Sequence, residues 1–349
     1  MKGRTVFFLK DSRIHDWLIE GFVKRNFPVK FLGMLIPPGL MAKSRIRRIF
    51  GLHFRYLRIS ALSLFSSKKG DIIICFLDVI GLYVFILSCI LFKSREIVVI
   101  NLMFNDRDDF ITSLKRSLFR LMLINPRVHP TVTSVALSEI YRQTFNLPGK
   151  KFHLLNDCYG TQKVYESNPG ETDYVFCGGI NGRDWVTLVK AASLLPDIHF
   201  VVVGPKKDTL GDHIPANIEY LFNVQPHEFQ LKMMNCSILA LPLDTEAPAG
   251  LIVLFSAGLM HKPVISTNSY TMREYITSGE NGYLVGMRDY EALADRIREL
   301  NDNNLLRKKF GEKLFEQVVK LGSPDAFIDR ILEILRLIDQ DGYTTNHTA

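Results

Sequence analysis

Short apolar runs of strand length alternate with segments of helical periodicity through the first half of the chain. Such runs predict strands buried in a parallel sheet, because both faces of these strands are covered by other elements. The expected strands are 5–9, 29–35, 72–76, 97–102 and 131–134, and the expected helices are 15–24, 79–92, 111–123 and 138–145. This alternation predicts a parallel, doubly wound sheet.

The second half repeats the alternation after a turn-rich segment at 168–171, which we interpret as a linker. Strands are expected at 174–177, 199–203, 218–221, 237–241 and 263–266, and helices at 185–195, 226–234, 252–260, 290–300, 305–318 and 324–337. The pattern therefore predicts two Rossmann-like domains in tandem, of the α/β class. We assign residues 1–168 to the first domain, 169–325 to the second, and 326–349 to a C-terminal helix and a disordered tail.

Charge is divided unevenly between the two halves of the 349-residue chain. Residues 1–170 hold 26 Lys and Arg against 12 Asp and Glu, a net of +14, whereas residues 171–349 hold 17 against 24, a net of −7. A basic half suggests an anionic partner such as a membrane surface, a phosphorylated acceptor or nucleic acid. No nucleic-acid-binding pattern accompanies the charge, so we expect no nucleic acid partner.

Two segments concentrate the positive charge among apolar residues, at 42–70 and 115–120. One interpretation is a solvated helix face with an apolar core side. The other is peripheral contact with anionic lipid, to which each nearby basic residue adds about 1 kcal/mol. The apolar stretch 72–92 is interrupted by Asp78, so we expect a strand and a core helix there and no spanning helix.

The remaining composition favours a cytoplasmic protein, peripheral at most at the inner membrane face. The five cysteines include no CxxC pair, which disfavours a disulfide framework or a zinc site. The N-terminal sequence reaches a charge after four apolar residues, which is too short for a signal peptide.

The segment 245–285 contains the most specific chemistry in the chain. An apolar strand ends at Pro242, an acidic loop with Asp244 and Glu246 follows, and a helix opens at Gly250. A helix start presents free backbone N–H groups and a positive dipole end, which suits a pyrophosphate. The preceding carboxylate suits sugar hydroxyls. The alternative is an ordinary loop and helix of an α/β core.

This segment resembles the donor half of glycosyltransferase family 4 at Gly250, at the PVI triplet 263–265 and at the ENGYLV turn 280–285. Upstream, Cys177-Gly178-Gly179 and Arg183 resemble the family's phosphate-binding turn. The resemblance covers about residues 130–335. It implies the GT-B fold, with two facing Rossmann-like domains. It also implies metal-independent, retaining, hexosyltransferase-like transfer from a nucleotide-sugar donor to a saccharide or lipid-linked acceptor, in polysaccharide biosynthesis.

Three positions depart from the family pattern. The second of the family's paired glutamates falls at Ser256, whose hydroxyl makes a weaker contact than a carboxylate. The first falls near Pro248, so Glu246 or Asp244 is expected to substitute for it. The glycine before the PVI triplet is His261.

Arg183 and Glu246 are the expected catalytic residues. Arg183 would clamp the diphosphate with its guanidinium, or alternatively form an ordinary surface ion pair. Lys190 would reach a phosphate or be solvated, and Asn223 follows a strand where the family holds the base. The expected donor-binding residues are Gly178, Gly179, Arg183, Lys190, Asn223, Asp244, Glu246, Gly250, Leu251 and Ser256.

Two alternative functions remain open from the sequence. The departures at Ser256 and His261 suggest a GT-B binding or scaffold protein without turnover. A nucleotide-sugar epimerase would need acid and base groups gathered in one cleft. The DxD pattern Asp106-Arg107-Asp108 is interpreted as a solvated loop, so we expect no metal and no cofactor apart from the substrate.

Overall fold

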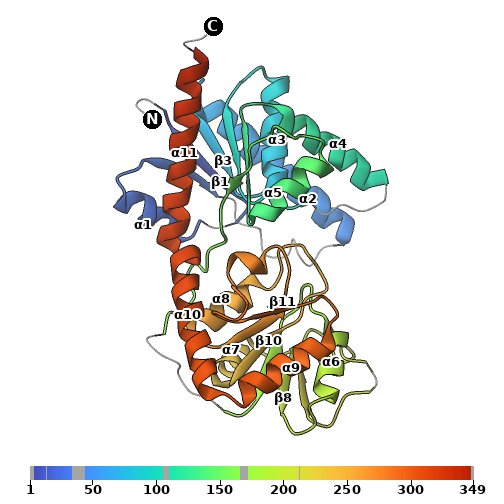
Figure 1. Ribbon diagram of the computed structural model, residues 1–349. Coiled ribbons are helices and arrows are strands. Elements are labelled where there is room, and N and C mark those ends of the chain that lie inside the picture. Colours follow the sequence, from blue (N-terminus) through green and yellow to red (C-terminus); the bar gives the residue numbers. More distant parts are fainter. Residues whose placement is uncertain are drawn as a thin grey trace. The chain divides into compact units, whose positions relative to one another are not determined.

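The structure, a computed structural model, describes residues 4–12, 14–33, 44–104, 110–165, 172–211 and 213–346 (Figure 1). The chain forms two compact units. Unit 1 comprises residues 1–156 together with 324–349, and unit 2 comprises residues 157–323. The expected boundary after residue 168 lies outside the described residues, whereas the units separate after Asn156.

Unit 1 is built on a six-stranded parallel sheet with the order β2-β1-β3-β4-β5-β6. Its strands are β1 (Val6–Lys10), β2 (Val29–Gly33), β3 (Ile72–Cys75), β4 (Glu96–Val99), β5 (Val128–Val132) and β6 (His153–Leu154). The central strands β1 and β3 are buried along their whole length, as their apolar sequences predict. The register pairs Val6 of β1 with Val29 of β2 and Ile72 of β3.

Helices cover both faces of this sheet. Its helices are α1 (Asp16–Lys24), α2 (Arg45–Ser66), α3 (Asp78–Ile90), α4 (Phe110–Ile124), α5 (Val135–Thr144) and α11 (Pro324–Asn346). Side chains of α2 to α5 pack with Phe7 and Leu9 in one apolar core. On the other face, the ring of Phe8 lies 6.4 Å from that of Phe22 on α1. The C-terminal helix α11 packs on α1 and so belongs to unit 1 (Figure 1).

Unit 2 also has a six-stranded parallel sheet, with the order β12-β11-β10-β7-β8-β9. Its strands are β7 (Val175–Gly178), β8 (Phe200–Gly204), β9 (Ile218–Phe222), β10 (Ile238–Leu241), β11 (Val264–Thr267) and β12 (Tyr283–Val285). Its helices are α6 (Trp185–Ser193), α7 (Pro226–Asn235), α8 (Leu251–Leu259), the short 3₁₀ helix η1 (Met272–Glu274), α9 (Tyr290–Asn301) and α10 (Asn304–Gly322). Two separate apolar cores fill its two faces.

The predicted α/β architecture with two Rossmann-like units is confirmed. Each sheet also contains one point at which the direction of strand succession reverses. In unit 1 this point lies between β1 and β3, and in unit 2 it lies between β7 and β10. Open α/β sheets bind ligands outside the carboxyl ends of the strands at such a switch point. The sheet topology therefore selects one edge in each unit as the place to look for a site.

Candidate functional site

The switch point of unit 2 brings together two loops that the sequence separates widely. The β7 loop, residues 179–184, starts where β7 ends at Gly178, and the β10 loop, residues 242–250, starts where β10 ends at Leu241. The two strands are neighbours in the sheet and run parallel. Most of the predicted donor-binding residues lie on these two loops or at the first residue of the helix that follows.

Backbone contacts hold the two loops against each other. Arg183 and Leu243 form an isolated antiparallel bridge. The backbone N–H of Asp244 donates a hydrogen bond of 3.1 Å to the carbonyl oxygen of Gly182. A Cβ atom on Gly182 would lie 2.6 Å from the Cγ2 atom of Thr245, and its φ of +64° is in the left-handed region. Glycine at position 182 therefore permits the close approach.

Arg183 is folded back onto its own loop. Its side chain is only 7% exposed, and burial lowers the pKa of the guanidinium. Its Nε donates to the carbonyl oxygen of Gly178 at 2.8 Å, and Nη1 donates to that of Asn181 at 2.8 Å. A Cβ atom on Gly179 would lie 2.3 Å from Nη2, so only glycine leaves room for this arrangement. Among the described residues, Nη2 forms no hydrogen bond.

Helix α8 begins directly after the β10 loop without a side-chain cap. Its N-cap residue Gly250 has a φ of +78°, and Leu251 opens the helix. The first N–H groups of a helix have no partner within the helix, and they carry the positive end of its dipole. The carboxylate of Glu246 accepts a 3.1 Å hydrogen bond from the N–H of Tyr270, whereas Asp244 is exposed. The loop thus presents backbone donors together with the carboxylate of Glu246, which a backbone N–H holds, and the exposed carboxylate of Asp244.

Ser256 is the sixth residue of α8 and is buried. Its Oγ is 2.9 Å from the carbonyl oxygen of Ile252 and 3.1 Å from Oε1 of Gln162, and it donates toward these two acceptors. The hydroxyl at the position of the family's second glutamate is therefore engaged within unit 2.

Two predicted residues lie apart from the paired loops. Lys190 is in the last turn of α6, and its Nζ lies 5.2 Å from the ring centroid of Tyr290, the first residue of α9. Asn223 follows β9, with the whole of β8 between it and β7. It remains on the carboxyl edge of the sheet, as do the exposed Lys206 and Lys207 after β8, which the sequence analysis missed.

His261 has a structural role at the family's glycine position. Its φ is +53°, the backbone conformation that makes glycine common at such turns. The imidazole stacks on Phe315 with 4.2 Å between ring centroids, and its two nitrogens lie 3.0 Å from the carbonyl oxygen of Tyr165 and 3.1 Å from a carboxylate oxygen of Glu312. Contacts of the His261 side chain with α10 thus stabilise a backbone conformation that glycine adopts more easily.

The switch point of unit 1 carries charged residues that the sequence analysis did not assign to a site. Lys10 ends β1 and is 6% exposed, with its Nζ 4.8 Å from the ring centroid of Phe76. Asp78 opens α3 and accepts the N–H groups of Val79 at 2.6 Å and Met103 at 3.3 Å. Burial lowers the pKa of Lys10 and raises that of Asp78. The sequence signal that could have identified both residues is a charged side chain directly after an apolar run of strand length.

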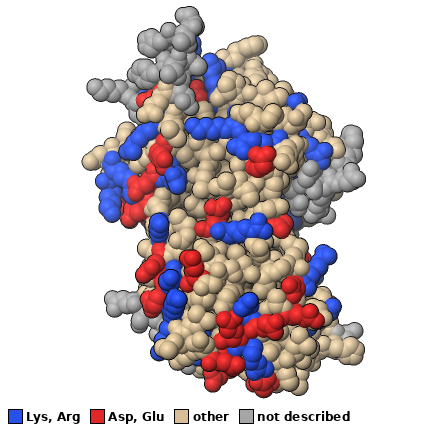
Figure 2. Space-filling model, viewed as in Figure 1, with Lys and Arg blue, Asp and Glu red and all other residues tan. Residues whose placement is uncertain are grey.

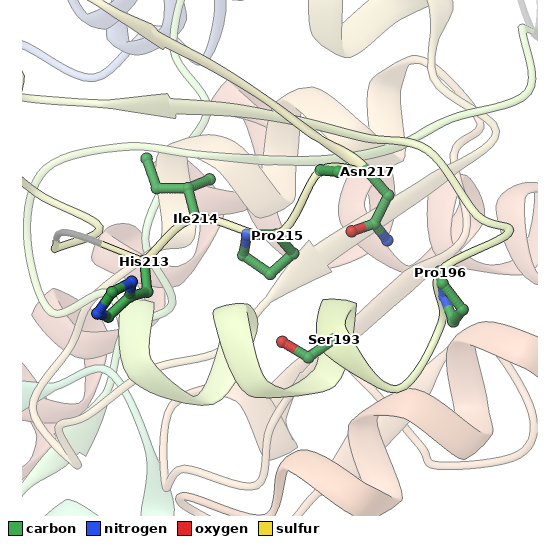
Figure 3. A pocket seen from close by; sticks show the side chains of 7 residues that line it. Ser193, Pro196, His213, Ile214, Pro215 and Asn217 are labelled. Carbon is green, nitrogen blue, oxygen red and sulfur yellow. The ribbon is translucent and has the colours of Figure 1, made fainter.

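A pocket of about 520 Å³ lies in unit 2 at the edge of the sheet opposite to the switch point (Figure 3). It is lined by Ser193, Pro196, His213, Ile214, Pro215, Ala216 and Asn217. The amide nitrogen of Asn217, which carries two hydrogens, lies 2.8 to 3.0 Å from three backbone carbonyl oxygens between residues 192 and 198, and so links the connections that lead into β8 and β9. These are the amino ends of the strands, so the hollow is distinct from the switch point.

The described residues contain neither a cluster of metal ligands nor a helix that could span a membrane. Within them, no three or more His, Cys, Asp or Glu side chains are gathered as metal ligands. The DxD pattern at 106–108 lies outside the described residues. In the same part of the chain, no helix combines the length and apolarity needed to cross a membrane.

Comparison with known proteins finds a family match within the second half of the chain. Residues 164–317 match the family model described as Glycosyl transferases group 1, and this range contains the paired loops. A segment of 92 residues is 33% identical to the lipopolysaccharide core biosynthesis glycosyltransferase LpsE of Rhizobium meliloti, and covers 26% of this chain and 27% of that protein. A second segment, of 82 residues, is 26% identical to the poly(ribitol-phosphate) alpha-N-acetylglucosaminyltransferase of Staphylococcus aureus. It covers 23% of this chain and 17% of that protein.

Solved structures extend the likeness in fold to nearly the whole chain. Sucrose-phosphate synthase from Thermosynechococcus elongatus has a TM-score of 0.71 at 12% identity, over 97% of this chain and 100% of that one. HepE from Anabaena, solved with UDP, has a TM-score of 0.63 at 12% identity, over 95% of this chain and 99% of that one. TarM of S. aureus has a TM-score of 0.57 at 16% identity, over 79% of this chain and 57% of that one. The predicted GT-B fold is therefore confirmed.

Proposed function

We propose that the chain transfers a hexose from a nucleotide-sugar donor bound by unit 2 to a saccharide or lipid-linked acceptor bound by unit 1. The observation that carries this proposal is the buried Arg183 on the β7 loop together with the uncapped start of α8 after the β10 loop. These two loops pair at the switch point of unit 2, within the range that matches the glycosyl transferases group 1 model. Two such positive elements at one sheet edge suit a diphosphate.

Each group has a defined chemical task in this proposal. The Nη2 atom of Arg183 and the N–H groups at the start of α8 stabilise the charge on the departing diphosphate. Glu246, held by the N–H of Tyr270, accepts hydrogen bonds from the sugar. The transfer retains the anomeric configuration and needs no metal. Structures similar in fold were solved with UDP, which makes UDP the first nucleotide to test.

The acceptor belongs to cell-surface polysaccharide synthesis in this proposal. The two relatives act, by their names, on lipopolysaccharide core and on poly(ribitol-phosphate). A net charge of +14 in residues 1–170 and the buried Lys10 at the switch point of unit 1 suit an acceptor that carries phosphate or carboxylate groups. We place the reaction in the cytoplasm, at the inner membrane face.

The first experiment is calorimetric titration of the full chain with UDP, GDP and their common sugars. One nucleotide should bind, and Arg183→Ala should weaken that binding at least about tenfold, the loss of one charge-assisted contact. Because Arg183 is buried, unfolding curves must show that the variant is folded. Arg298→Ala is the matched control, since Arg298 pairs with Asp197 at the opposite edge of the sheet. Absence of binding by every nucleotide would refute the donor site.

One alternative retains an observation in its favour. The engaged hydroxyl of Ser256 offers no carboxylate at the family's second glutamate position, which suits a binding protein without turnover. Donor binding with neither transfer nor slow donor hydrolysis would establish that alternative. An epimerase would instead interconvert the free nucleotide-sugar without any acceptor. The family match favours transfer over both.

A further inference from the structure

Helix α2 presents its large apolar side chains to solvent. Ile46, Phe50, Phe54 and Leu57, which we call the apolar stripe, recur at spacings of four, four and three residues and therefore lie along one face of the helix. All four are exposed, Phe50 by 73% and Phe54 by 68%. A helix on the surface of a globular protein normally turns such residues toward the core. Here Ile59 and Leu64, in the last two turns, make the core contact.

The charge of α2 identifies the partner. The helix contains five arginines and no acidic residue. Arg47 and Arg58 are exposed, and the helical period places them beside the apolar stripe. The neighbouring layer continues this character, because α4 has three basic residues, no acidic residue, and exposed Leu114, Leu121 and Ile124. Both helices pack on α3, which lies between them on the same face of the sheet (Figure 1).

We propose that the apolar stripe and the arginines beside it dock unit 1 onto an anionic lipid bilayer. Aromatic and aliphatic side chains on one face of a cationic helix are the features of helices that lie in the membrane interface. The stripe inserts into the boundary between headgroups and acyl chains, while Arg47 and Arg58 contact lipid phosphates. The helix lies flat on the membrane and does not span it.

Unit 2 has the opposite surface character. Figure 2 shows acidic side chains gathered over part of unit 2, and α9 alone contributes Glu291, Asp295 and Glu299. Anionic lipid repels such a surface, so the attraction acts on unit 1. Docking is thus a property of unit 1 that does not depend on the donor site.

Vesicle co-sedimentation of the full chain tests the proposal. The chain should bind vesicles that contain phosphatidylglycerol, bind phosphatidylcholine vesicles much more weakly, and lose binding as salt is raised. Phe50→Ser/Phe54→Ser should weaken binding at least about tenfold, since two aromatic side chains no longer insert. Arg47→Gln/Arg58→Gln should weaken it about 25-fold at low salt, about fivefold for each charge removed.

Matched variants in unit 2 show whether the loss of vesicle binding is specific to the apolar stripe and the arginines beside it. Both control variants are on α10. Leu305→Ser removes an apolar side chain that is 81% exposed, and Lys308→Gln/Lys309→Gln removes two exposed charges. These controls should bind vesicles as the original chain does. Equal binding by the Phe50→Ser/Phe54→Ser variant, or binding to neither vesicle type, would overturn the proposal. Concentration-dependent dimers that the same variant abolishes, without vesicle binding, would assign the stripe to a second copy instead.

Discussion

At the scale of single residues, the conformation of Arg183 depends on the absence of a side chain at position 179. Gly179 has a φ of +127°, and its missing Cβ leaves the space that the guanidinium occupies. Gly179→Ala should therefore displace Arg183, destabilise the chain by about 1–3 kcal/mol, and weaken nucleotide binding. Denaturant unfolding and calorimetric titration measure the two effects. Gly149→Ala is the control, since a Cβ atom on Gly149 would meet none of the described residues within 4 Å apart from its chain neighbours. Unchanged nucleotide affinity in Gly179→Ala would show that the folded-back arginine is not needed.

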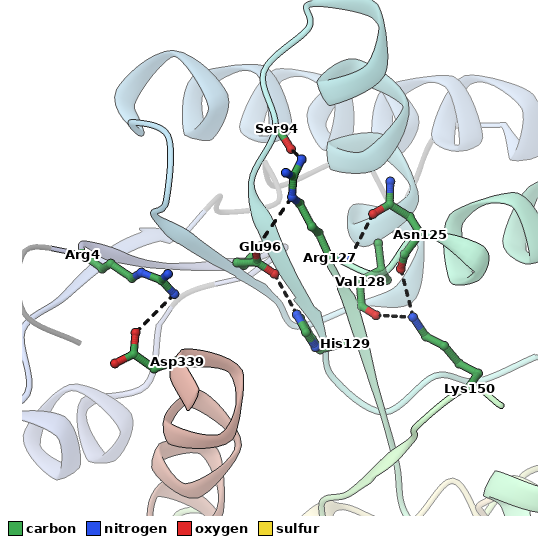
Figure 4. Close-up of polar contacts among 9 residues, drawn as sticks. All are labelled: Arg4, Ser94, Glu96, Asn125, Arg127, Val128, His129, Lys150 and Asp339. Carbon is green, nitrogen blue, oxygen red and sulfur yellow. Dashed lines mark hydrogen bonds and ion pairs between the residues drawn. The ribbon is translucent and has the colours of Figure 1, made fainter. Parts of the chain in front are cut away.

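Lys150 provides a residue-scale test based on pH. Its Nζ donates to the carbonyl oxygens of Asn125 at 3.0 Å and Val128 at 2.6 Å (Figure 4). Burial lowers its pKa from 10.5 to about 8. Between these values the unfolded chain binds more protons than the folded one, so this group's contribution to stability increases as pH rises from about 8 toward 10.5.

Comparison with Lys150→Met isolates this contribution. The free energy of unfolding of the original chain, minus that of the variant, should increase across this pH range because the other titrating groups cancel. Urea unfolding at a series of pH values provides the measurement. A difference that stays flat with pH would show that Lys150 keeps its ordinary pKa in the folded chain.

At the scale of elements, α10 crosses the turn between α8 and β11 so closely that a glycine is required. A Cβ atom on Gly311 would lie 2.0 Å from the carbonyl oxygen of His261, which the backbone cannot easily move. Gly311→Ala should therefore destabilise unit 2 by about 3 kcal/mol, although alanine is the better helix former. Lys309→Ala, exposed on the same helix, should change stability little. A Gly311→Ala variant as stable as the original chain would contradict this packing.

The elements are also where prediction from sequence succeeds and where it fails. Strands such as β7 and β10 were predictable because buried parallel strands are continuously apolar. The start of α8 was predictable from the Pro-Ala-Gly sequence before it. The contact between the β7 and β10 loops was not, since it depends on strand order and on the left-handed backbone of Gly179 and Gly182. The apolar stripe of α2 was visible as composition, but its exposure required the packing of Ile59 and Leu64.

At the scale of the whole molecule, the chain returns to unit 1 after completing unit 2. Helix α11 follows α10 directly, yet its side chains pack on α1. Asp329 forms an ion pair with Arg25 at 2.5 Å, and the rings of Phe327 and Trp17 lie 5.9 Å apart. The apolar periodicity of 324–337 predicted a helix but did not specify which unit it covers, because either sheet offers an apolar face. The sequence analysis therefore placed it in a separate C-terminal segment.

Ile328 tests this assignment because it is fully buried and a Cβ atom on Gly21 of α1 would lie 1.9 Å from its Cδ1. Ile328→Ala should remove about 2–5 kcal/mol of stability from unit 1, through lost apolar contact and the cavity left behind. Hydrogen exchange read peptide by peptide locates the effect. Exchange should accelerate in the strands of residues 6–132 and stay unchanged in those of 175–285, while Arg330→Ala, exposed on the same helix, should alter neither. Acceleration confined to 175–285 would show that α11 stabilises unit 2 instead.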